Sequence, residues 1–131
     1  MQENKKQEDN TQESLEYLQS DVYATVADYL PKLIRTANLV AGEFLEGEQE
    51  DTRDLFDQVV EGINWVLDVY NHSPSALYRG QGRGEKTQLE QMIQRLSQAI
   101  SRNNKSEMAN SLSDDMIPFL QAFHEEILLL R

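Results

Sequence analysis

The chain of 131 residues contains no cysteine, only 3 prolines, and only 12 basic residues against 23 acidic ones. The absence of cysteine excludes a disulfide framework, a thiolate zinc site, an iron–sulfur cluster and a cysteine nucleophile. It is compatible with a reducing compartment, and we expect a cytoplasmic protein. Because no cofactor-binding motif is present either, we expect no cofactor.

Basic side chains are scarce enough to give a formal net charge of −11. Phosphate groups of nucleic acids and anionic membrane surfaces are bound by Lys and Arg, so we expect neither as a partner. A negative field instead favours a basic partner, because opposite charges steer the encounter. Long apolar runs are also missing, since no segment approaches the roughly 18 consecutive apolar residues of a membrane-spanning helix. The N-terminus likewise lacks the apolar stretch that a secretory signal needs.

What is present is helical patterning. Apolar residues recur at gaps of three and four residues along four segments, which predicts four amphipathic helices. We expect them over residues 13–46, 51–70, 87–102 and 106–130. Pro31 lies inside the first segment and predicts either a kinked long helix or a split near Leu30, and Pro118 predicts a kink or restart in the fourth.

Turn and capping residues separate these segments. Gly47 suits the left-handed position after the first helix. Asp51 or Thr52 is expected to cap the second helix and Ser106 the fourth. The apolar stripe expected to bury the third helix consists of Leu89, Ile93, Leu96 and Ile100.

These segments predict an all-α fold, an antiparallel four-helix bundle made of two helical hairpins. Residues 1–12 are almost wholly polar and are expected to form a disordered tail. Residues 13–131 then form one domain. Within it we expect a hairpin at 13–72, a connecting loop at 73–86 and a second hairpin at 87–131.

The acidic residues gather in the first hairpin. Residues 11–72 hold 13 acidic and 3 basic residues, whereas residues 87–131 hold 6 and 4. This asymmetry favours a role in steering a basic partner, and the alternative is a solvated helix tip that keeps the protein soluble. The acidic residues expected to face the partner are Glu43, Glu46, Glu50, Asp54 and Asp57.

Aromatic residues follow the same helical spacing. Trp65 and Tyr70 are candidates for an apolar contact with a partner helix, and the alternative is packing in and around the core. His124 is expected at the surface or boundary of the last helix.

An enzyme is the alternative class. Carboxylates three residues apart on facing helices can hold Mg²⁺, and in this the chain resembles all-α nucleotide pyrophosphatases. The pairs here lie near a turn and no nucleotide-binding Lys or Asn set accompanies them, so we expect no enzyme and no metal site. The pairs are Glu13/Glu16, Glu43/Glu46, Asp51/Asp54 and Asp54/Asp57. A structural homodimer is a third possibility, because Leu128, Leu129 and Leu130 can form an exposed apolar end.

Three segments carry a resemblance to a known group: Tyr29–Ile34 with its Leu-Pro pair, Gly47, and Val59–Val66 with its Gly-x-x-Trp pattern. They resemble a group of small, uncharacterised helical proteins from Gram-positive bacteria, over residues 28–70. In size, acidity and helical build the chain is also similar to flagellar and type III export chaperones. We therefore expect a non-enzymatic adaptor or export-type chaperone, monomeric or homodimeric, that binds a basic or amphipathic helix of a partner protein.

Overall fold

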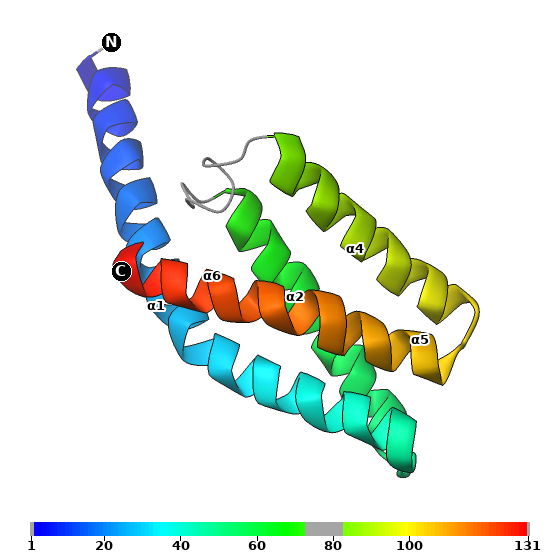
Figure 1. Ribbon diagram of the computed structural model, residues 1–131. Helices are drawn as coiled ribbons and strands as arrows, with labels where there is room; N and C mark the ends of the chain where they lie inside the picture. The colour runs from blue at the N-terminus through cyan, green and yellow to red at the C-terminus, as the bar shows by residue number, and fades with distance from the viewer. Residues whose placement is uncertain (1, 73–82, 131) are drawn as a thin grey trace.

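The computed structural model describes the backbone of residues 2–72 and 83–130, and the side chains of residues 21–72 and 88–129 (Figure 1). Within these residues the chain forms helices joined by turns and no strand. The elements are α1 (Gln2–Glu46), α2 (Thr52–Asn71), α4 (Arg83–Ser101), α5 (Lys105–Asn110), the π-helix η1 (Ser111–Met116) and α6 (Ile117–Leu130).

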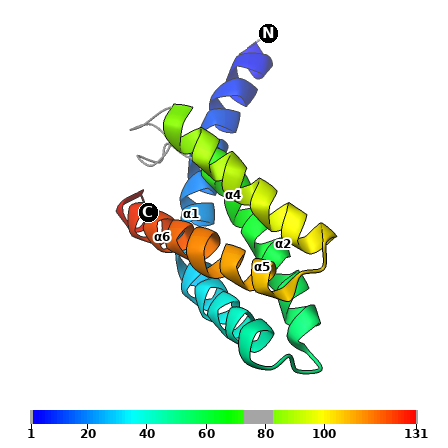
Figure 2. The same ribbon diagram turned by 45° about the vertical axis from the view of Figure 1, so that its right-hand side comes forward.

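Because α5, η1 and α6 follow one another without a break, the described chain has four helical rods, and the predicted all-α bundle is confirmed. Short turns join α1 to α2 and α4 to α5, so the rods of each hairpin run antiparallel (Figures 1 and 2). The helix α1 is central, since it packs against α2, α5 and α6, whereas α4 packs mainly on α5 and η1.

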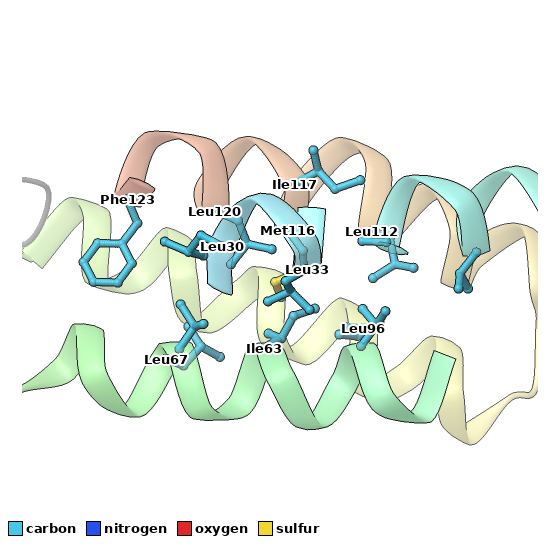
Figure 3. Packing of buried hydrophobic residues seen from close by; sticks show 14 of the residues in the cluster. Leu30, Leu33, Ile63, Leu67, Leu96, Leu112, Met116, Ile117, Leu120 and Phe123 are labelled. Carbon is cyan, nitrogen blue, oxygen red and sulfur yellow. The ribbon is translucent and has the colours of Figure 1, made fainter. Parts of the chain in front are cut away.

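The core lies where side chains from all four rods meet (Figure 3). Leu30 of α1, Ile63 of α2 and Leu120 of α6 are at most 1% exposed. Leu96 of α4 closes the core from the remaining side and is 6% exposed. Complete burial of such a side chain contributes about 1.5–3 kcal/mol, so this shared core holds the rods together.

The helix α1 continues through Pro31, so it is not split. Its ribbon changes direction in its light-blue part, and its N-terminal part projects beyond the other helices (Figure 1). Proline removes one backbone donor and crowds the preceding turn, which bends a helix without ending it when packing holds both halves.

Two predicted boundaries are wrong. Residues 2–12, expected as a disordered tail, continue the helix α1. Adding turns to an existing helix avoids the cost of nucleation, and Gln, Glu and Lys are good helix formers. The loop expected at 73–86 ends earlier, because α4 begins at Arg83. Residues 73–82 lie outside the described part of the chain.

The fourth rod does not restart at Pro118. It widens instead into η1, where the N–H of Ile117 donates to the carbonyl of Leu112, five residues back. This wider turn lies directly before Pro118, which has no N–H to offer to the helical ladder. The rod therefore stays continuous although its hydrogen-bond spacing changes.

The turns differ from the predicted ones in three places. Gly47 is not left-handed, and its N–H continues the helical pattern by bonding the Glu43 carbonyl at 2.9 Å. The left-handed residue is Asn103, with φ 51°, at the end of α4. The cap of α5 is Asn104 rather than Ser106, since its side chain accepts the N–H of Glu107 at 3.0 Å.

The predicted stripe of α4 is half wrong. Leu89 and Leu96 are buried as expected, but Ile93 and Ile100 are 37% and 40% exposed. The neighbouring positions Met92 and Ala99 face the core in their place. Ala99 is 1% exposed, and its small side chain allows α4 to approach its neighbours closely at this point.

Candidate functional site

The acidic turn between α1 and α2 is partly an internal network. The hydroxyl of Thr52 donates to the Glu43 carboxylate at 2.6 Å and accepts the backbone N–H of Gln49 at 2.7 Å. Thr52 itself is fully buried, and Asp51 precedes it without making a side-chain cap. Glu43 therefore organises the turn, which is a structural role that differs from the predicted partner contact.

A second network ties this turn to the turn between α4 and α5. The Glu48 carboxylate lies 2.8 Å from the Lys105 ammonium and 3.3 Å from the Arg53 guanidinium. Arg53 also donates to the side chain of Asn103 and lies over the ring of Phe44. These cations hold the pKa of Glu48 below its ordinary value, with the hydrogen bond from Lys105 as the largest cause. The network therefore uses Glu48 and Arg53 to connect the two turns.

A row of exposed acidic residues lies along α2. Asp54, Asp57 and Glu61 are spaced by three and four residues, so they share one outward face of the helix. Trp65 continues that face four residues later. We call these four residues the α2 acidic face. Among the described residues, none of its three carboxylates has an ion-pair partner. Glu46 and Glu50, also predicted for the site, are exposed just before α2.

Trp65 is the aromatic member of this face. Its side chain is 39% exposed, and its ring meets that of Tyr29 edge-to-face at 5.5 Å between centroids. The contact fixes the indole on one side and leaves the other side in solvent. An anchored, half-exposed tryptophan is typical of residues that dominate binding energy at protein interfaces.

Tyr70 does not share this exposure, so it is not part of the α2 acidic face. It is 3% exposed and packs edge-to-face against Phe119 and Phe123 of α6. The stripe that places Ile63 and Val66 in the core also turns Tyr70 inward, because it lies four residues beyond Val66.

Sequence reasoning missed Glu61 and Arg95. Glu61 was detectable, since it lies four residues after Asp57 on a predicted helix. Arg95 of α4 makes a bidentate ion pair with Asp115 of η1, with N–O distances of 2.9 and 3.0 Å. That pair raises the pKa of Arg95. No sequence signal pointed to it, because it depends on how α4 meets the fourth rod.

The carboxylate pairs considered for metal binding are dispersed. In the part of the chain that the structure describes, no three His, Asp or Glu side chains come close enough to hold a metal ion. The side chains of Glu13 and Glu16 lie outside that part. No described helix is both long and apolar enough to cross a bilayer.

Fold and surface together define a small acidic all-α bundle. Residues 21–126 match a protein family described as a domain of unknown function, DUF8042, and the chain belongs to that family. No curated protein and no solved structure matches the chain.

Proposed function

We propose that the protein is a non-enzymatic interaction module, a small adaptor or export-type chaperone in the bacterial cytoplasm. It binds a basic or amphipathic helix of a partner protein. The observation that carries this proposal is the α2 acidic face, where three exposed carboxylates lead along the helix to a half-exposed tryptophan. The resemblance to helical proteins of Gram-positive bacteria supports the bacterial setting.

Each part of this face has its own role in binding. Exposed carboxylates in water contribute little to affinity but accelerate association with a basic partner. The indole supplies apolar area that leaves water on binding, which slows dissociation. The partner's complementary surface therefore has an apolar residue flanked by Lys or Arg.

Affinity capture from the host's lysate tests the proposal. The bait is the full chain, and the bound proteins are identified by mass spectrometry at low and high salt. Two matched variants are compared with the wild type. In the first, Asp54, Asp57 and Glu61 are replaced by the corresponding amides. In the control, the same charge change is made at three other exposed residues, Asp21, Glu90 and Glu125.

The proposal predicts a salt-sensitive partner that the variant of the α2 acidic face captures less efficiently than the wild type and the control variant do. An empty capture with a folded bait would contradict it, as would a partner retained equally by all three baits. Circular dichroism confirms the folded state of each bait.

A homodimer is the second candidate, because Leu128 and Leu129 at the end of α6 are 42% and 83% exposed. Leu130 lies outside the described side chains. Sedimentation equilibrium of the wild type and of Leu129→Glu decides this question. A dimer that dissociates in the variant supports the homodimer, and a monomeric wild type excludes it.

A further inference from the structure

An apolar hollow of about 290 Å³ lies between α2, α4 and the junction of η1 with α6. Buried Tyr70 and Leu89 form its base, and half-buried Met92, Phe119 and Ala122 form its walls. We call it the α4–α6 hollow. Its size is at the lower end of ligand pockets, so it suits an inserted side chain better than an enclosed small molecule.

The rim of the hollow carries two carboxylates with different surroundings. Asp115 is held by the Arg95 guanidinium and is largely shielded. Asp114, directly before it, is exposed and has no ion-pair partner among the described residues. Because Arg95 is already paired, the Asp114 charge is uncompensated at the mouth of an apolar cavity. A cation next to an apolar group is the complementary chemistry.

We propose that the α4–α6 hollow takes an apolar side chain from an amphipathic helix of a partner protein, and that a Lys or Arg of the same helix pairs with Asp114. This inference rests on the proposed function and adds the place where the partner helix anchors. Helices that dock in grooves present apolar anchors at intervals of three and four residues with polar neighbours, which matches an apolar base beside an acidic rim.

Methionine-methyl NMR of the full chain reads this site directly. The chain has 4 methionines, and Met92 lines the hollow whereas Met108 and Met116 are at most 1% exposed in the core. The probe is a short amphipathic helical peptide of leucine and lysine. We expect the Met92 methyl signal to shift saturably during titration while the two core methyl signals stay in place.

A matched pair of substitutions on α6 tests the shape of the hollow. Ala122→Trp fills it, and Gln121→Trp places the same ring on the exposed neighbouring position. The first should weaken peptide binding by about tenfold or more and the second should leave it unchanged. Asp114→Asn should weaken binding by up to about fivefold, the range of an exposed ion pair.

The outcomes separate this inference from the proposed function. Saturable binding with an unmoved Met92 signal, or equal affinity of the two tryptophan variants, overturns the α4–α6 hollow as the anchor. If the amide signals of α2 shift in that case, the protein is still an interaction module, but the partner helix is anchored at Trp65. A peptide that does not bind the wild type also overturns the inference, and lysate capture then decides the proposed function independently.

Discussion

The Nε2 atom of His124 lies 3.2 Å from the carbonyl oxygen of Ala27, across 97 residues of sequence. In a regular α-helix that carbonyl would accept the N–H of residue 31, but residue 31 is a proline and has no N–H. The imidazole of α6 therefore supplies the donor that Pro31 lacks, and it joins α6 to the bend of α1. This partly buried position agrees with the boundary placement predicted for His124.

His124→Phe keeps an aromatic ring but removes the donor. We expect it to reduce the free energy of unfolding by about 1 kcal/mol, because the Ala27 carbonyl loses its partner. In a Pro31→Ala background the loss should be much smaller, since the alanine introduced there can provide the backbone N–H. Urea unfolding of the four proteins in this double-mutant cycle measures the coupling. Equal losses of unfolding free energy in both backgrounds would show that the His124 imidazole does not replace the missing N–H of Pro31.

Gly62 lies where α2 packs against the Tyr29 and Leu33 side chains of α1. A Cβ atom at Gly62 would overlap the hydroxyl of Tyr29 and lie 2.9 Å from Cδ1 of Leu33. We expect Gly62→Ala to destabilise the fold by about 1–3 kcal/mol through overpacking, although alanine is the better helix former. The melting temperature measures the change.

Gly42 gives the matched control, because nothing lies within 4 Å of a Cβ atom there. Gly42→Ala should stabilise the helix by up to about 1 kcal/mol. Adding Tyr29→Phe to Gly62→Ala removes the overlapping hydroxyl and should restore part of the stability. A neutral Gly62→Ala would show that the two helices are not in tight contact.

The ion pairs of Glu48 are expected to make the free energy of unfolding depend on pH. Its pKa is lowered from 4.5 by Lys105 and Arg53, so its charged form favours the folded state. The contribution is complete above the unfolded pKa and is lost as the pH falls through the lower folded pKa. Urea midpoints should therefore show Glu48→Gln to be less stable than wild type near neutral pH, with the difference vanishing at low pH. The exposed Glu50→Gln serves as the control, and a difference that grows in acid would contradict the network.

Arg95 is expected to hold α4 in place. The helix packs mainly on α5 and η1, and the bidentate pair with Asp115 crosses that contact. Arg95→Leu should speed hydrogen exchange of the α4 amides while those of α2 keep their protection, because the least attached element opens first. Uniform loss of protection across both helices would instead indicate global destabilisation.

The amphipathic spacing was sufficient to predict the helices and most of the core, but not the rotation of α4. The stripes 89-93-96-100 and 89-92-96-99 share Leu89 and Leu96 and have the same three-four spacing. Choosing between them requires the position of η1, which widens the facing rod. The π-turn has no sequence signal comparable to an apolar stripe, so the exposure of Ile93 and Ile100 could not be foreseen.

The positions of the residues predicted for the site follow the same logic. Helical spacing indicates that Asp54 and Asp57 share a face, and the structure places both on the exposed side of α2. Helical spacing cannot indicate the hydrogen bond from the Thr52 hydroxyl to the Glu43 carboxylate, because this bond depends on the path of the turn. Trp65 and Tyr70 are close in sequence, yet only the structure separates an exposed ring from one enclosed by the phenylalanines of α6.

The rate at which the captured partner associates with the protein decides whether the α2 acidic face guides binding. Stopped-flow mixing compares the wild type with the variant neutralised at Asp54, Asp57 and Glu61, over a range of ionic strength. We expect fast association of the wild type that falls with salt, and slower association of the variant with a weaker salt dependence. Identical association rates for the two proteins at every salt concentration would contradict the claim that the α2 acidic face guides the partner.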